Sequence, residues 1–307
     1  MIDDGLFEQF PMQAVYGMHN WPGLPAGQFA IGPGPVMAAY NTFRIVIRGK
    51  GCHAALPHMG LDPLPVAAQL ILAFQTILTR NKKASDTAVL SVTNFHAGEA
   101  TNVVPGECVM TGTVRTFSAE VLDLIERRMQ ALVEHTGLAH NMQCTLEFDR
   151  IYPATINHEA EAALAREVMQ GLVGPQNVLP QEAAMTAEDF AFMLEARPGC
   201  YAFIGNGTGD HRHVGHGEGP CTLHNASYDF NDEVLPLGAS YWVRLVEKAL
   251  DAGRQAPRHE RLAAVRAGRC RYSSDGLWPT CCAGQQRSCR VGIHAHAVRA
   301  FPWARCF

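Results

Sequence analysis

The hydrophobic residues between Asn41 and Asp149 switch repeatedly between the two-residue spacing of strands and the 3.6-residue spacing of helices. In chain order, the expected elements are a strand at 42–48, a helix from Asp62 to about Lys83, strands at 87–95 and 108–117, a helix from Ser118 to Gly137, and a strand around Cys144–Phe148. This strand–helix–strand–strand–helix–strand order is typical of a ferredoxin-like fold, in which both helices cover one face of a four-stranded sheet. We therefore expect residues 41–152 to form a separate small domain.

Short polar signals set the expected helix ends in this segment. Asp62 is an N-cap residue followed by Pro63 at the first helical position, and Ser118 is the cap of the second helix. Gly137 is the expected stop of that helix, because glycine readily takes the left-handed conformation that closes many helices.

The flanking segments, 1–40 and 153–250, have the mixed strands and helices of an α/β layer. The expected elements are a strand at 14–18, a helix at 159–173, a helix opened by a capping box at Thr186–Asp189, a buried strand at 200–205, and a helix from Asp232 to about Leu250. We expect these two segments to form one discontinuous domain, into which residues 41–152 are inserted.

Residues 251–307 differ from the rest of the chain, because no hydrophobic period is sustained and arginine is used there without lysine. One alternative is a small zinc module built from Cys270, Cys281, Cys282, Cys289, His294 and His296. A second is an arginine-rich arm that binds nucleic acid. The cysteines lack a paired Cys-x-x-Cys spacing, and Trp and Pro interrupt the arginines. We expect an unrelated, disordered tail of out-of-frame or read-through sequence.

The overall composition excludes several classes of protein. With 307 residues, 47% hydrophobic and 18% charged, the chain is long enough for two globular domains. Its formal net charge of -4 gives no general attraction to nucleic acid or membranes, and no hydrophobic run approaches the roughly 20 residues of a membrane helix. The acidic start of the chain lacks the features of a signal peptide, so we expect a cytoplasmic protein whose ten cysteines are thiols.

Two histidines are candidate metal ligands. His19 lies where a strand is expected to end, the edge at which open α/β sheets place functional groups, and His224 lies in a polar loop before a helix. Neutral imidazole is the commonest metal ligand in proteins, and two such side chains can share a divalent ion. Position alone also fits histidines that make only local hydrogen bonds, so both interpretations stay open at this point.

Six motifs occur in a fixed order over residues 1–250. They are Val15-Tyr-Gly-Met-His19-Asn-Trp-Pro-Gly23, Gly49-Lys-Gly-Cys-His53-Ala-Ala-Leu-Pro-His58, Thr101-Asn-Val-Val-Pro105, Gly112-Thr-Val-Arg-Thr-Phe117, Ala187-Glu-Asp-Phe-Ala-Phe-Met-Leu194, and Leu223-His-Asn with Tyr228-Asp-Phe-Asn-Asp232. This set resembles the M20 metallopeptidase family, in the branch that contains hippurate hydrolases and plant indole-acetyl-amino-acid hydrolases.

The resemblance implies a zinc-peptidase-like α/β catalytic domain and an inserted ferredoxin-like domain that forms a homodimer. It also implies two divalent ions, often manganese, zinc, nickel or cobalt, which polarise an amide carbonyl and activate a water molecule. The implied reaction is hydrolysis of an N-acyl amino acid to a carboxylic acid and a free amino acid.

Five residues match functional positions of this family. His19 and His224 match ligands of the two different ions, and His53 matches a histidine that reaches the neighbouring subunit's site and donates to the developing oxyanion. Asn102 and Arg115 match positions that hold the carboxylate of the substrate, for which the fork of arginine is suited. A loop position for His53 and a surface salt bridge for Arg115 are the alternatives that the residues alone allow.

Glu188 and Asp189 lie at the expected start of a helix, and we interpret them as capping residues rather than as ligands.

The same resemblance predicts an incomplete metal site. Family members supply a Cys, a His and a Glu as further ligands, and an adjacent Glu as general base, in a segment that would precede Met1. Two histidines that serve different ions are too few for a closed dinuclear site. We therefore expect weak metal binding and an inactive chain.

Three hypotheses follow for the function of the chain. The first is a fragment or degraded copy of an N-acyl-amino-acid amidohydrolase. The second is a non-catalytic partner that forms a dimer with a full-length homologue and provides His53 to it. The third is a binding protein for acylated amino acids that uses Asn102 and Arg115.

Overall fold

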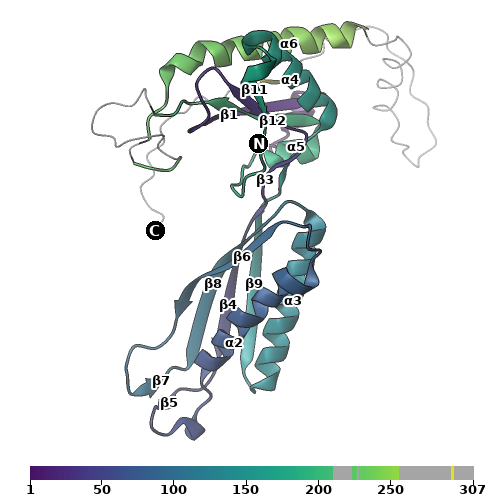
Figure 1. Ribbon diagram of the computed structural model, residues 1–307. Coiled ribbons are helices and arrows are strands. Elements are labelled where there is room, and N and C mark those ends of the chain that lie inside the picture. Colours follow the sequence, from purple (N-terminus) through teal and green to yellow (C-terminus); the bar gives the residue numbers. More distant parts are fainter. Residues whose placement is uncertain (210–222, 227, 256–291, 294–307) are drawn as a thin grey trace, which may run out of the picture. The chain divides into compact units, whose positions relative to one another are not determined.

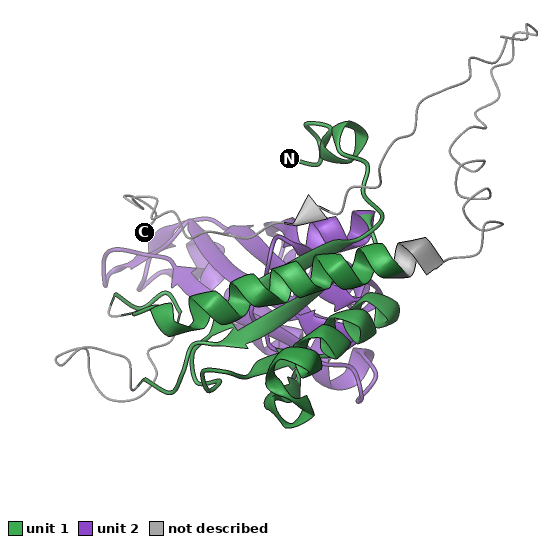
Figure 2. Ribbon diagram, turned by 90° about the horizontal axis from the view of Figure 1, so that it is seen from above, with its two compact units in different colours: residues 1–32, 158–181, 197–307 green, residues 33–157, 182–196 purple. Residues whose placement is uncertain are grey.

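A computed structural model describes residues 1–209, 223–226, 228–255 and 292–293 of the chain. The chain divides into two compact units (Figure 2). Unit 1 contains residues 1–32, 158–181 and 197–307, and unit 2 contains residues 33–157 and 182–196. Each unit has its own sheet and its own hydrophobic core.

Unit 2 is built on a four-stranded sheet (Figure 1). Its strands are β4 (Tyr40–Arg48), β6 (Ala88–His96), β8 (Glu107–Thr116) and β9 (Gln143–Tyr152). They lie in the order β6-β8-β4-β9, and each neighbouring pair is antiparallel. The first and third strands of the chain order are therefore central, and the second and fourth form the edges.

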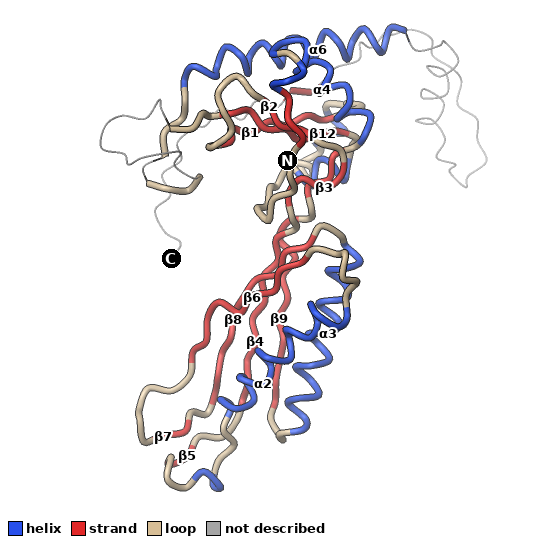
Figure 3. The backbone as a smooth tube through the Cα atoms, viewed as in Figure 1, coloured by secondary structure: helices blue, strands red, loops and turns tan. Residues whose placement is uncertain are grey.

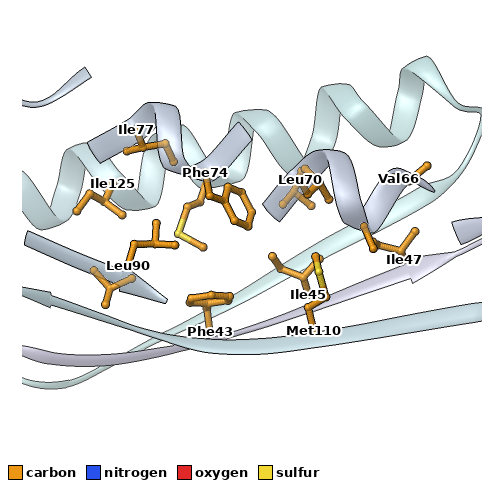
Figure 4. Close-up of a cluster of buried hydrophobic side chains, with 14 of the residues drawn as sticks. Phe43, Ile45, Ile47, Val66, Leu70, Phe74, Ile77, Leu90, Met110 and Ile125 are labelled. Atoms are coloured by element: carbon orange, nitrogen blue, oxygen red, sulfur yellow. The ribbon is translucent and has the colours of Figure 1, made fainter. Parts of the chain in front are cut away.

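Two helices cover one face of this sheet, α2 (Pro63–Thr76), which continues into a π-helical turn η2 (Ile77–Asn81), and α3 (Ala119–Ala139). Figure 4 shows the core between the sheet and these helices, with Phe43 and Met110 on the strands facing Leu70, Phe74 and Ile125 on the helices. Alternate residues of each strand enter this core because successive side chains of a strand point to opposite faces. The strand–helix–strand–strand–helix–strand order expected from the sequence is present.

The capping signals of these helices differ in how well they work. Asp62 accepts a hydrogen bond from the backbone N–H of Leu64 at 3.0 Å, and Ser118 accepts one from the N–H of Val121 at 3.4 Å. Gly137 does not end α3, which continues to Ala139 and has His140 as its C-cap. An added Cβ at Gly137 would meet the Cys144 sulfur at 2.9 Å, so close packing against β9 explains this glycine.

Short elements complete unit 2. They are β3 (Gly34–Met37), β5 (Cys52–His53), the 3-10 helix η1 (Pro57–Met59), β7 (Val103–Val104), β10 (Thr155–Asn157) and α5 (Ala191–Ala196). Strand β5 pairs with β7 (Figure 3). Strand β3 pairs with β10. The backbone N–H of Ala38 donates to the carbonyls of Ala184 and Thr186 at 3.1 and 2.9 Å. These pairings assign residues 33–40, 153–157 and 182–196 to unit 2, whereas the sequence predicted them in the flanking domain.

Unit 1 is a five-stranded, mostly parallel sheet with helices over one face. Its strands are β1 (Val15–Trp21), β2 (Phe29–Ile31), β11 (Val178–Pro180), β12 (Gly199–Gly205) and β13 (Gly292–Ile293), in the order β11-β2-β12-β1-β13. Its helices are α1 (Leu6–Gln9), α4 (Glu159–Val173), η3 (Pro175–Asn177), η4 (Asp232–Val234) and α6 (Leu235–Gln255). Side chains of α4 and α6 pack against Tyr16, Phe29 and Cys200 in its core.

Several expected boundaries in this part of the chain were wrong. The cap before the last helix is Asn231, whose side chain accepts from the N–H of Glu233 at 3.1 Å, rather than Asp232. The capping box at 186–189 does not open a helix at that point, because α5 begins only at Ala191. Within the expected disordered tail, residues 251–255 belong to α6 and Gly292–Ile293 pair with β1. The remaining tail residues, and with them the residues of the alternative zinc module, lie outside the described residues.

Two further sequence predictions concern membranes and disulfides. Among the described helices, none combines the length and the apolar character needed to cross a bilayer. The cytoplasmic location itself stays a prediction from the sequence. The four cysteines reported for the described residues, Cys52, Cys108, Cys144 and Cys200, are free thiols, as expected.

Candidate functional site

His19 lies on β1, two residues before the end of this strand at Trp21, and its side chain is half-buried. The strand extends beyond the expected end at Met18, because His19 and Trp21 continue the parallel pairing with β12. The imidazole Nδ1 lies 2.7 Å from the carbonyl oxygen of Asn20. Since a carbonyl only accepts hydrogen bonds, Nδ1 carries the proton and Nε2 has the lone pair that a metal ion needs.

The segment that carries His224 is fixed at the same edge of the unit 1 sheet. The amide of Asn20 donates to the hydroxyl of Tyr228, four residues after His224. Asn206, which follows β12 and is buried, donates to the carbonyl of Asp229 at 3.0 Å and accepts from the N–H of Asn231 at 2.9 Å. His224 itself is exposed. These contacts bring the two motifs that contain the predicted ligands to neighbouring strand ends.

Asn20 and Asn206 were missed as site-forming residues by sequence reasoning. The signal was present, because each is a polar residue at or directly after the end of a strand in a parallel sheet. Their role is to position the loop through hydrogen bonds, which a search for metal-binding side chains does not detect.

The described residues do not form a metal site by themselves. In this part of the chain there is no group of three or more His, Cys, Asp or Glu side chains that could hold an ion. Two imidazoles from different segments are fewer donors than a stable site of two ions needs. The donor set therefore does not fit a dinuclear centre on its own, and no chemical step is derived through one.

His53 and Asn102 come together on the β5–β7 ribbon of unit 2. The N–H of Ala54 donates to the backbone carbonyl of Asn102 at 3.0 Å, and both predicted residues have exposed side chains. The N–H of Ala55 donates to Nδ1 of His53 at 3.0 Å. Because Nδ1 accepts, the proton of the neutral ring is on Nε2, which leaves an N–H that can donate to a ligand.

Arg115 lies far from this ribbon, on strand β8 of the four-stranded sheet. The ribbon adjoins the start of β8 at Glu107, where Figure 3 shows β5 and β7, and Arg115 is near the other end of that strand. The eight residue steps between Glu107 and Arg115 span about 27 Å at roughly 3.4 Å per residue. The structure therefore brings His53 and Asn102 together but does not bring Arg115 to them.

The guanidinium of Arg115 is half-buried on the sheet face opposite the helices. Its Cζ lies 4.1 Å from the ring centroid of Tyr40, and Nη1 donates to the Thr113 hydroxyl and to the Val114 carbonyl at 3.4 Å. Burial lowers the pKa of Arg115 from its ordinary value, while Tyr40 acts in the opposite direction. Both features identify a cation that has lost part of its hydration.

Unlike other arginines of this sheet, Arg115 has no ion pair with a carboxylate among the described residues. Arg44 pairs with Glu147 at 3.6 Å, and Arg48 pairs with Glu107 at 3.3 Å. The surface salt bridge that was the alternative for Arg115 is therefore absent from this part of the chain.

Glu188 and Asp189 lie in the turn before α5. The N–H of Phe190 donates to the Glu188 carboxylate at 3.4 Å, in the turn that precedes Ala191, so the two acidic residues lie before the helix rather than in its first turn.

Comparison with known proteins identifies the family of the chain. The family model described as peptidase family M20/M25/M40 matches residues 1–248. The chain belongs to this family. The M20 match ends close to Leu250 and includes all six motifs.

Curated M20 relatives include enzymes named for N-acyl amino acids. The chain is 34% identical over 257 residues to the N-acetyl-L-cysteine deacetylase of Bacillus subtilis. This alignment covers 83% of the chain and 58% of that protein. It is 33% identical over 251 residues to the hippurate hydrolase of Campylobacter jejuni, covering 81% of this chain and 63% of that protein. The chain thus spans about six tenths of the length of these relatives.

A solved M20 structure agrees with the fold. The YXEP protein of Bacillus subtilis, described as a dinuclear metal-binding peptidase from the M20 family, superposes with a TM-score of 0.65 at 27% identity. The alignment covers 81% of this chain and 60% of that one. The α/β fold of the chain is therefore that of M20 proteins, and dinuclear metal binding is a described property of this relative.

Proposed function

We propose that the chain belongs to a metal-dependent amidohydrolase that cleaves N-acyl amino acids. In this reaction water adds to the amide carbonyl carbon, the C–N bond breaks, and a carboxylic acid and a free amino acid are released. The observation that carries the proposal is the half-buried Arg115 guanidinium, which has no carboxylate partner among the described residues. Relatives named as an acetylcysteine deacetylase and a hippurate hydrolase support this substrate class, since both substrates have one free carboxylate.

Arg115 binds the substrate carboxylate in this proposal. One amino group is occupied by Thr113 and Val114, and the remaining N–H groups are suited to the two oxygens of a carboxylate. Asn102 supplies a second polar contact to the substrate, and the Nε2–H of His53 donates to the oxygen of the former carbonyl as it gains negative charge.

The separation of about 27 Å along β8 supports a homodimer formed through residues 41–152. An N-acyl amino acid is too short to contact Arg115 and His53 of the same subunit. Two copies related by a twofold axis solve this problem, because the His53–Asn102 ribbon of one copy then serves the substrate held by Arg115 of the other.

His19 and His224 are the proposed ligands of two divalent ions, and sequence resemblance to M20 proteins extends to both. When bound, such ions polarise the amide carbonyl and activate water. The described residues supply one imidazole for each ion, so the proposal includes further donors that they do not contain.

Calorimetry with hippurate tests the proposed carboxylate site. We expect heat of binding from the chain and its loss in Arg115→Ala, because a half-buried ion pair with a bidentate carboxylate contributes roughly 2 kcal/mol or more. Arg44→Ala is the matched control, since Arg44 is an arginine of the same sheet that already has a carboxylate partner. Absence of heat with the unchanged chain, or equal heat from both variants, would contradict the proposal.

A second function is favoured by one observation: unit 2 has a complete sheet and core, whereas the described residues contain no cluster of metal ligands. In this alternative, the chain is a non-catalytic partner of a full-length M20 homologue and provides His53 to it.

Co-expression with such a homologue tests the partner role. Copurification with raised hydrolysis of hippurate is expected, and His53→Ala should copurify without raising it. If the two chains do not copurify, the partner role is excluded.

A further inference from the structure

A row of aromatic rings lies beside Arg115, on the side of the unit 2 sheet opposite α2 and α3. The Tyr40 ring lies under the guanidinium, with 4.1 Å between Cζ and the ring centroid. Tyr152 is paired with Tyr40 in the sheet, and their ring centroids are 6.0 Å apart in an edge-to-face arrangement. Phe192 of α5 continues the row, with its centroid 6.2 Å from that of Tyr152. The row therefore begins at the proposed carboxylate site and extends away from it.

Strand alternation places Tyr40 on this face, and a register shift in β9 pairs Tyr152 with it. Phe43 and Val114 point into the core under the helices, so Tyr40, three residues before Phe43, and Arg115, directly after Val114, belong to the opposite face. Tyr40 and Tyr152 remain partly exposed, and Phe192 is 41% exposed. The rings therefore have apolar surface that a ligand can contact, because they are not fully buried in a hydrophobic core.

We propose that the amino acid part of the substrate has a large apolar side chain, which packs on Tyr152 and Phe192 while Arg115 holds its carboxylate. This inference rests on the proposed function and specifies its substrate class. In an amino acid, the side chain and the carboxylate are both bonded to the α-carbon. A ligand anchored at Arg115 therefore places its side chain within reach of the adjacent ring and its acyl group in another direction.

The chemistry of the row favours an aromatic or branched aliphatic side chain. Aromatic rings prefer edge-to-face and offset contacts with other rings, the geometry that Tyr40, Tyr152 and Phe192 already show with each other. A cationic side chain would be repelled by Arg115, and glycine would leave the rings in contact with water only. Removing water from such apolar surface stabilises the complex in proportion to the area covered.

Two ligands that differ only in this side chain provide the test. N-benzoylglycine and N-benzoyl-L-phenylalanine have the same acyl group and the same carboxylate. In calorimetry with the full chain, we expect the phenylalanine compound to bind roughly 10-fold to 200-fold more tightly, the range that an enclosed hydrophobic pocket gives for a single methylene, because these rings are partly exposed. Equal affinities, with heat that disappears in Arg115→Ala, would overturn the inference while leaving the proposed function intact. No heat with either ligand would remove both.

A substitution of Phe192, at the exposed end of the row, distinguishes a role in ligand binding from a role in packing α5 on the sheet. Phe192→Ala should reduce the preference for the phenylalanine compound to about twofold or less, with unchanged affinity for N-benzoylglycine. Phe95→Ala is the matched control, because Phe95 is 42% exposed on the edge strand β6 of the same unit. The inference is wrong if Phe192→Ala weakens both ligands equally, or neither, since the rings would then serve only to hold α5 on the sheet.

Discussion

Tyr241 on α6 is the largest fully buried side chain of the described residues, and its hydroxyl has no hydrogen-bond partner there. Burial raises the pKa of this phenol well above its ordinary value, so the group stays neutral. An unpaired buried hydroxyl costs about 1–3 kcal/mol of stability. We expect Tyr241→Phe to raise the free energy of unfolding by about 1 kcal/mol in urea denaturation. Tyr241→Ala should lower it by about 3–5 kcal/mol through the cavity that it leaves, and a loss of stability in Tyr241→Phe would refute the argument.

At the residue scale, the sequence identified candidates but not their chemical state. Family motifs were sufficient to select His19, His53 and Arg115. The tautomers of the two histidines depend on whether a carbonyl or an N–H faces Nδ1, and this is decided by local backbone geometry. Likewise, the missing partner of Arg115 follows from strand register, which places carboxylates opposite Arg44 and Arg48 but not opposite Arg115.

At the scale of elements, Gly112 shows why one motif position on β8 is glycine. A Cβ added there would lie 2.1 Å from the Ser91 carbonyl oxygen on β6 and 2.3 Å from the Phe43 ring on β4. We expect Gly112→Ala to destabilise the protein by about 2–3 kcal/mol, because neither the strand nor the packed ring can move away cheaply. The measurement is the urea midpoint.

Gly171 on α4 is the control for Gly112, because an added Cβ there meets nothing within 4 Å. Gly171→Ala should be neutral or stabilise the protein by up to about 1 kcal/mol, since alanine is the better helix former. Similar losses in both variants would show that backbone entropy, rather than the contacts of Gly112, dominates.

Cys108, which is buried on β8, predicts a dependence of stability on pH. Burial, with a smaller contribution from Glu107, raises the pKa of Cys108 from 9.0 to about 11. Between these values the unfolded chain loses the thiol proton while the folded chain keeps it, so stability is fully retained below pH 9 and falls as the pH approaches 11. Cys108→Ala should have a flatter stability profile from pH 8 to 11 in chemical denaturation, and identical slopes for both proteins would contradict this.

Element boundaries could be predicted where the signal is local. The helix at 159–173 and the caps Asp62 and Ser118 were found because periodicity and capping chemistry lie in adjacent residues. The pairing of β3 with β10, and the hydrogen bonds that join 182–196 to unit 2, involve segments more than 100 residues apart. Such contacts leave no periodic pattern, which is why the unit boundaries differ from the expected ones.

At the scale of the whole molecule, the small number of metal ligands among the described residues predicts weak metal binding. A ligand stabilises a protein only to the extent that its concentration exceeds the dissociation constant. The described residues contain two candidate imidazoles and no cluster of three donors. We therefore expect MnCl₂ at about 1 mM, a concentration at which sites of low affinity stay mostly empty, to leave the melting temperature unchanged. His19→Ala is the control and should give the same result, whereas a rise that His19→Ala abolishes would reveal further donors.

The backbone of His224 gives its position a consequence for variation. Its φ is 64°, in the left-handed region where side chains other than glycine are disfavoured by about 1 kcal/mol. Glycine would relieve this strain, but it would remove the imidazole that the proposed metal site uses. Stability and function thus select opposite residues at this position. In M20 homologues that have lost activity, we expect glycine or asparagine to replace this histidine. We expect active enzymes to retain the histidine despite its backbone strain.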